Sequence, residues 1–137
     1  MHPVDRFRES FANFDPATPF PVEQIYAPDV TFEDPAHRID GREALAAYFA
    51  RLNRNLKAVR FTFHHDVRGD SVAALSWTME LRLRVGPRRP VVVPGSTWVE
   101  HDGQLVTSQR DHFDLGAMLY EQVPVLGTLV RTVRRAL

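Results

Sequence analysis

The chain of 137 residues contains no cysteine, and this absence excludes two kinds of site. Without thiols the protein can form neither a disulfide framework nor a thiolate metal centre. Excess charge is missing as well, because Lys and Arg number 17, Asp and Glu number 17, and the formal net charge is zero. A nucleic-acid-binding protein usually carries a basic field. We therefore expect no nucleic-acid partner.

Long apolar runs are also absent. No stretch approaches the ~20 apolar residues that span a bilayer. The first residues, MHPVDRFRESF, carry charges where a secretory signal would be apolar. We therefore expect no membrane partner and a cytoplasmic location. The 44% apolar fraction is enough for a core, and the length predicts one domain over residues 1–137.

Apolar residues at spacings of three and four predict the helices. The first is expected over residues 3–14 and a short second one over residues 22–26. A third is expected over residues 42–55, with Asp40 as its N-cap. Its buried face is expected to carry Leu45, Tyr48, Phe49 and Leu52.

Alternating segments separated by turns predict the strands. They cover residues 30–34, 58–67, 72–85, 91–100 and 104–114, with a brief return strand within residues 36–39. Hairpin connections make such a sheet mostly antiparallel. The expected fold is α+β, in which a strongly bent sheet forms a cone wrapped on the N-terminal helices.

Two helices are expected after the sheet, over residues 115–120 and 125–137. The last has an apolar stripe and basic residues elsewhere, a pattern found on membrane surfaces and also on helices packed over a core. We interpret it as a lid packed on the cone. The stripe consists of Leu126, Leu129, Val130, Val133 and Leu137.

Asp34 ends a short strand on the same side as Val30 and Phe32. Pro35 follows and prevents further ladder bonding. The carboxylate is therefore either a turn residue that caps a nearby N–H or a group held in a pocket.

Asp111 shares one face of the last strand with Gln109 and Phe113. It is either a pocket carboxylate or the partner of an internal Arg or a backbone donor. Five large side chains are expected in the core or the pocket wall, and their size favours a flat, apolar ligand. They are Phe61, Phe63, Trp77, Met79 and Trp98.

His37 and His65 are possible acid–base partners. His37 follows Asp34 by three residues and lies either at a pocket mouth or in a surface turn. His65 shares the aromatic face of its strand and is otherwise a hydrogen-bonded core residue. His64 and His65 point to opposite sides of a strand, so they form no local metal signature. We predict no metal and no cofactor.

The segment TFEDPAH, preceded by YAPD and followed by GREALAAYF, resembles the nuclear transport factor 2-like superfamily in its SnoaL-like and ketosteroid isomerase-like branch. The segment SQRDHFD resembles the last strand of that fold, and the resemblance covers nearly the whole chain. It implies that Asp34 matches the general base of ketosteroid isomerases. It also implies that Asp111, like an acidic residue of limonene epoxide hydrolase-like enzymes, faces the cavity.

Other positions depart from these relatives. Phe7 stands where the isomerases keep an oxyanion-hole tyrosine, and Ser96 stands where they keep the oxyanion acid. Trp77 and Met79 stand where the epoxide hydrolase keeps an Arg and an Asp. We therefore expect neither constellation to operate unchanged.

The resemblance implies a small-molecule enzyme that acts on a hydrophobic carbonyl or epoxide-like substrate without a cofactor. Asp34 or Asp111 would be the base. The developing oxyanion would be bound by Ser96, Gln109, His37 or His65. The alternatives are a non-catalytic binding module with an apolar cavity and a dimeric interaction protein. We expect a small hydrophobic ligand and a homodimer.

Overall fold

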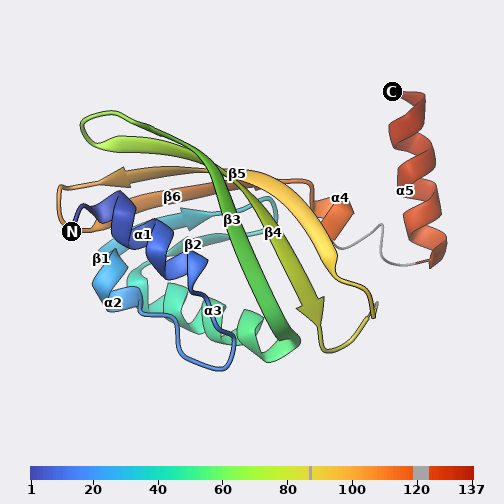
Figure 1. Ribbon diagram of the computed structural model, residues 1–137, viewed down its shortest axis with the longest axis horizontal. Helices are drawn as coiled ribbons and strands as arrows, with labels where there is room; N and C mark the ends of the chain where they lie inside the picture. The colour runs from blue at the N-terminus through green and yellow to red at the C-terminus, as the bar shows by residue number, and fades with distance from the viewer. Residues whose placement is uncertain (87, 119–123) are drawn as a thin grey trace.

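The computed structural model describes residues 1–86, 88–118 and 124–137 (Figure 1). Helices and strands follow one another in the order α1 (Pro3–Ala12), α2 (Val22–Ile25), β1 (Tyr26–Glu33), β2 (Arg38–Asp40), α3 (Arg42–Asn55), β3 (Leu56–Arg68), β4 (Val72–Leu83), β5 (Val91–His101), β6 (Val106–Phe113), α4 (Leu115–Met118) and α5 (Pro124–Ala136). The expected helix over residues 115–120 is present as α4, and its last two expected positions lie outside the described residues.

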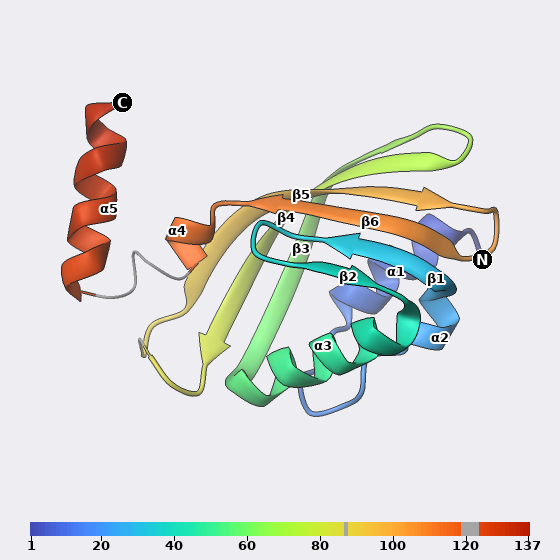
Figure 2. The same cartoon turned by 180° about the vertical axis from the view of Figure 1, so that it is seen from behind.

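The strands form one open sheet in the order β2-β1-β6-β5-β4-β3. Neighbours are antiparallel except β1 and β6, which run parallel. The long strands β3 to β5 bend across the molecule, and the N-terminal helices lie in the hollow of the sheet (Figures 1 and 2). The predicted α+β class and the bent, mostly antiparallel sheet are therefore confirmed.

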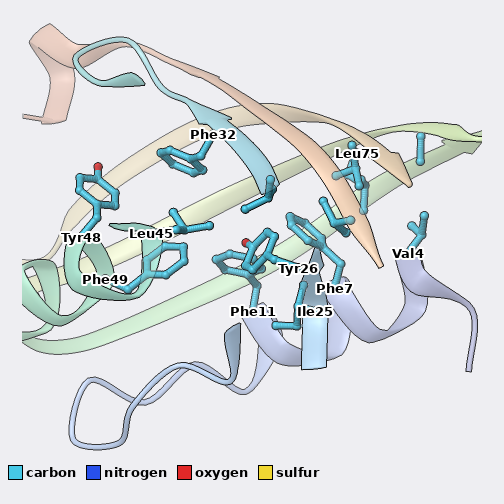
Figure 3. Close-up of a cluster of buried hydrophobic side chains, with 14 residues drawn as sticks. Val4, Phe7, Phe11, Ile25, Tyr26, Phe32, Leu45, Tyr48, Phe49 and Leu75 are labelled. Carbon is cyan, nitrogen blue, oxygen red and sulfur yellow. The ribbon is translucent and has the colours of Figure 1, made fainter. Parts of the chain in front are cut away.

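The core lies where α1 and α3 meet the concave face of the sheet (Figure 3). Phe7 and Phe11 of α1 pack with ring centroids 4.7 Å apart, and Phe11 reaches Phe49 of α3 at 6.3 Å. Tyr26 and Leu75 are 0% and 1% exposed on the sheet side. The helical spacing of the apolar residues in α1 and α3 thus delivers one aromatic layer to the inside of the sheet.

The start of α3 differs from the prediction. Gly41, not Asp40, is the N-cap, and no side chain caps the helix. Asp40 instead belongs to β2, opposite Thr31 of β1, where its carboxylate lies 3.4 Å from Arg38. The turn between β2 and α3 needs a φ of +94° at Gly41, a value that glycine adopts easily.

The lid interpretation of the C-terminal helix is wrong for the part of its stripe that the structure describes. Leu129 and Val133 of α5 are each 58% exposed, and α5 stands apart from the sheet in both views (Figures 1 and 2). Arg134 pairs with Asp114 at 3.0 Å. Among the described residues, none of the helices combines the length and apolarity needed to cross a membrane.

Gly95 allows the indole of Trp77 to lie flat on the neighbouring strand. The two residues are partners across β4 and β5, and a Cβ at Gly95 would lie 2.7 Å from the Cζ2 atom of Trp77. We predict that Gly95→Ala destabilises the protein by about 1–3 kcal/mol because the indole must move within a packed wall. Urea unfolding measures this loss.

Ser96→Ala is the matched control, since the next position of β5 does not face Trp77; we expect a change within about 0.5 kcal/mol. Equal stability of Gly95→Ala and the wild type would contradict the close packing described here.

Candidate functional site

A cavity of about 310 Å³ opens between the concave face of the sheet and the helices α1 and α3. Its wall is mostly apolar and aromatic. It is lined by Phe7, Phe11, Phe14, Phe32, Asp34, Ala36, His37, Tyr48, Phe49, Leu52, Asn55, Leu56, Val59, Phe61, Phe63, Trp77, Met79, Leu81, Leu83, Thr97, Gln109, Asp111, Phe113 and Leu115. Both candidate carboxylates, Asp34 and Asp111, therefore reach the same cavity.

Asp111 is held by one of its two carboxylate oxygens. Its Oδ1 atom accepts hydrogen bonds from Thr97 Oγ1 at 2.7 Å and from Gln109 Nε2 at 3.0 Å. Its Oδ2 atom has no hydrogen-bond partner among the described residues. The carboxyl group is thus fixed in orientation and keeps one oxygen available to a molecule in the cavity.

Two buried donors orient the groups that hold Asp111. The hydroxyl of Tyr26 donates to Gln109 Oε1 at 2.6 Å, which turns the Gln109 NH₂ group toward Asp111. The indole N–H of Trp77 donates to Thr97 Oγ1 at 2.8 Å, which leaves the threonine hydroxyl proton for Asp111. Both chains of hydrogen bonds point their donors at the same carboxylate oxygen, and such chains strengthen each other in an apolar interior.

The pKa of Asp111 is raised to about 6, chiefly by burial; the hydrogen bonds from Gln109 and Thr97 act in the opposite direction, and the nearby Asp34 adds a smaller upward contribution. Desolvation dominates because the ionised form loses hydration in an apolar cavity. A carboxyl group of this kind changes its protonation state near neutral pH.

Asp34 is both a turn residue and a cavity residue, so the two alternatives open in the sequence coexist. Its Oδ1 atom accepts hydrogen bonds from the backbone N–H groups of Ala36 and His37 at 2.8 and 2.7 Å. Its Oδ2 atom accepts one from the Tyr48 hydroxyl at 2.5 Å, and the His37 ring nitrogen Nδ1 lies 3.2 Å from Oδ1. With its side chain 5% exposed, Asp34 is a carboxylate saturated by donors.

The parallel pairing of β1 with β6 brings the two carboxylates together. Phe32 lies beside Gln109 and Glu33 beside Arg110 in the register of these strands. The next inward positions are Asp34 and Asp111, and adjacent strands lie only about 4.8 Å apart. The cavity therefore contains two neighbouring carboxyl groups from segments far apart in the sequence.

His65 lies outside the cavity, contrary to the prediction from strand alternation. A register shift between Phe63 and His65 inserts one extra residue in β3. Asp66 then takes the inward parity, and His65 is exposed with its Nδ1 atom 3.0 Å from Ser76 Oγ. A bulge of this kind reverses the faces of all residues beyond it.

Ser96 and Trp98 also lie outside the cavity. The inward residues of β5 include Val93, Thr97 and Val99, which are all nearly fully buried. Ser96 and Trp98 have the opposite parity, and Trp98 is 53% exposed. The remaining predicted cavity residues do line it: His37, Phe61, Phe63, Trp77, Met79 and Gln109.

Three residues that hydrogen-bond to Asp34, to Asp111 or to Gln109 were not predicted as site residues: Tyr26, Tyr48 and Thr97. Thr97 has the inward parity shared with Val93 and Val99, so alternation along β5 carried a signal for it. Tyr48 was expected in the buried face of α3, but its hydrogen bond to Asp34 depends on how α3 crosses β1. Likewise, the hydrogen bond of Tyr26 to Gln109 joins residues that are far apart in the sequence, so it depends on the tertiary structure.

In the described ranges, no group of three or more His, Asp or Glu side chains is arranged to hold a metal ion. The cavity contains a carboxyl group with one oxygen that lacks a hydrogen-bond partner among the described residues, a second carboxyl group surrounded by donors, and a half-exposed histidine.

The model of a protein family, the SnoaL-like domain, matches residues 4–109 of this chain. A comparison with curated proteins finds no match. A protein from Catenulispora acidiphila with a ketosteroid isomerase-like fold, in complex with trimethylamine, is 21% identical with a TM-score of 0.74; the match covers 88% of this chain and 90% of that one.

Two further solved structures have the same fold. An LEH-like epoxide hydrolase of M. tuberculosis is 21% identical with a TM-score of 0.68, and the match covers 95% of this chain and 93% of that one. A candidate SnoaL-like polyketide cyclase from Shewanella putrefaciens is 16% identical with a TM-score of 0.72, and the match covers 90% of this chain and 94% of that one. At these identities the similarity establishes the fold alone.

The raised pKa of Asp111 predicts a pH dependence of stability. Because the folded protein binds the Asp111 proton more tightly than the unfolded chain, the contribution is fully present below about pH 4. It is lost as the pH rises through about 6. We expect the free energy of unfolding of the wild type, minus that of Asp111→Asn, to fall by up to about 3 kcal/mol between pH 4 and 7.

Urea unfolding at several pH values tests this expectation. Asp70→Asn, in the exposed turn between β3 and β4, is the control and should follow the wild type at each pH. If the free energy of unfolding of the wild type, minus that of Asp111→Asn, instead increases with pH, the pKa of Asp111 is lowered and not raised.

Proposed function

Since the chain belongs to the SnoaL-like domain family, we propose that it is a cofactor-independent acid–base enzyme acting on a small hydrophobic molecule in the cavity. The observation that carries this proposal is the carboxyl group of Asp111. One of its oxygens is fixed by Thr97 and Gln109, and the other is left to the cavity.

Asp111 is the proton acceptor in this proposal. A base is most effective when its pKa lies near the working pH, and the pKa of Asp111 is raised to about 6. Its Oδ2 atom takes a proton from a carbon next to a carbonyl group, or from a water molecule that attacks an epoxide. The donors on Oδ1 keep Oδ2 in position throughout, so the fixed geometry lowers the cost of orienting the base.

Asp34 positions other groups and is not the base. Its oxygens already accept bonds from two backbone N–H groups and from Tyr48, which leaves little capacity for a substrate proton. Oδ1 of Asp34 accepts a hydrogen bond from Nδ1–H of His37, which leaves Nε2 of His37 as the acceptor nitrogen of the ring. His37 lies at the cavity mouth, half exposed, where it can exchange protons with the oxygen of the substrate.

The reaction differs from those of two relatives in its polar groups. Trp77 and Met79 line the cavity at the positions that the resemblance assigns to the Arg and Asp of the epoxide hydrolase. Phe7 also lines it, at the position of the isomerase tyrosine. Structures similar to this chain include a candidate polyketide cyclase and an epoxide hydrolase, which supports a small hydrophobic substrate of the carbonyl or epoxide class.

A direct test is the exchange of hydrogen for deuterium next to the carbonyl group of apolar ketones such as 1-tetralone, followed by mass spectrometry in D₂O. We predict exchange above the buffer rate, rising as the pH passes through about 6 as Asp111 ionises. Asp111→Asn should lower the catalysed rate roughly 10²–10⁴-fold. Diol formation from apolar epoxides is the parallel assay.

Asp70→Asn is again the control and should keep the wild-type rate, because this exposed turn residue lies far from the cavity lining. If Asp111→Asn retains full activity, the assignment of the base is wrong. Ligand binding without any turnover would support the alternative, a binding module, which the saturation of Asp34 by donors favours.

We also propose that two copies pair through the outer face of the sheet. Trp98 and Val92, both on β5, are 53% and 55% exposed on this face, whereas the opposite parity of the strand is buried. Aromatic side chains are enriched where protein surfaces meet.

We predict a dimer by light scattering at micromolar concentration and a monomer for Trp98→Arg, because a charge at the centre of such a face loses hydration on pairing. Lys57→Glu changes a charge at another exposed position, near the start of β3, and should leave the mass unchanged. A monomeric wild type at high micromolar concentration would contradict the dimer.

A further inference from the structure

The charged side chains that line the cavity are acidic, although the chain as a whole has equal numbers of acidic and basic residues. The protein has 17 Lys and Arg residues, yet none of them lines the cavity within the described part of the chain. Two carboxyl groups do line it, Asp34 and Asp111. A molecule that enters therefore meets two carboxyl groups and aromatic rings, and meets no Lys or Arg that would bind a carboxylate or a phosphate.

Asp111 lacks a cationic partner. The groups that hold it, Thr97 and Gln109, are neutral, and the described residues form no ion pair with it. Buried charges in proteins are normally paired. The Oδ2 atom, without a hydrogen-bond partner among the described residues, therefore offers an incoming cation a carboxylate oxygen in an apolar cavity.

The other charged groups near the cavity do not fill this place. His37 contacts Asp34 and is half exposed, so any charge on its ring is directed to Asp34 at the mouth. Arg51 lies over the ring of Tyr48 with its guanidinium 5.9 Å from the ring centroid, and it does not line the cavity. Tyr26 and Tyr48 are neutral, because burial raises the pKa of each hydroxyl.

We propose that the natural ligand of this cavity is a small hydrophobic amine, bound as its ammonium ion against Asp111 beside Asp34. The proposal rests on the function proposed above only in placing the substrate in this cavity. It adds the charge of that substrate, which the family of the chain does not specify.

The wall next to Asp111 suits an ammonium ion. Trp77 reaches Asp111 through Thr97, and the Trp77 ring meets Phe61 edge-on, with centroids 5.6 Å apart. Phe63 stacks beside Phe61 at 6.3 Å. The faces of Trp and Phe rings attract cations, and this attraction grows when water is excluded. The carboxylate supplies the charge-assisted hydrogen bond, and the rings supply the remaining contacts of the ammonium group and of an apolar skeleton.

The size of the cavity limits the skeleton. A volume of about 310 Å³ lies at the lower end of small-molecule sites, which run from roughly 300 to 1,000 Å³. We therefore expect an amine with one or two rings. Such a ligand would also lower the pKa of Asp111, since a nearby positive charge favours the ionised carboxylate.

Calorimetry with three probes on one skeleton tests the proposal: 4-phenylbutylamine, 4-phenylbutan-1-ol and 4-phenylbutanoate. At pH 7.5 we expect the amine to bind at least tenfold more tightly than the alcohol, and the carboxylate not to bind. Between pH 6 and 4 the affinity for the amine should fall up to about tenfold per pH unit as protons compete for Asp111, whereas the affinity for the alcohol should stay constant.

Asp111→Asn should remove the preference for the amine and keep the affinity for the alcohol, because Asn fills the same space without the charge. Asp70→Asn should retain the wild-type preference. Equal affinities of the wild type for amine and alcohol, binding of the carboxylate, or no binding of the amine at millimolar concentration would each overturn the proposal.

These outcomes are separate from those of the exchange assay. Deuterium exchange that depends on Asp111, together with equal binding of amine and alcohol, would refute the amine proposal and keep the enzyme. A clear amine preference without turnover of any probe would keep the amine proposal and favour the binding module.

Discussion

The parallel pairing of β1 with β6 is the contact on which the candidate site depends. These are the only parallel neighbours in a sheet that is otherwise antiparallel throughout the described residues, and they join the start of the chain to the end of the sheet. The pairing aligns the inward positions of the two strands, so that Phe32 lies beside Gln109 and both Asp34 and Asp111 reach one cavity. Without it, the two carboxyl groups would belong to separate walls.

The same burial that stabilises the fold also sets the chemistry of the cavity. Aromatic side chains from α1, α3, β3 and β4 form a mostly apolar wall around the cavity. In that environment an ionised carboxylate loses hydration, which raises the pKa of Asp111. Asp34 avoids this isolation because a turn and Tyr48 surround it with donors. Two identical side chains in one cavity thus differ in their electrostatic surroundings because their hydrogen-bond partners differ.

The buried hydrogen bonds behind Asp111 link the core to the site. Tyr26 and Trp77 are large core residues, yet the polar group of each is committed to a residue that holds the carboxylate. Gly95 in turn gives the indole of Trp77 its space. A change in core packing therefore alters the orientation of Asp111 through these two hydrogen bonds. The stability of the core and the geometry of the carboxyl group depend on the same contacts.

Periodicity alone determined the elements and most of the cavity wall. Alternation placed Phe61, Phe63, Trp77, Gln109 and Asp111 on inward faces, because side chains of a regular strand must point to alternate sides. Tertiary structure decided what local pattern does not contain. The bulge in β3 turned His65 outward, which the regular alternation of its neighbours does not predict. The partners of Asp34 and Asp111 were settled by the crossing of α3 over β1 and by the pairing of β1 with β6, since contacts between distant segments depend on the whole fold and not on the spacing of neighbours.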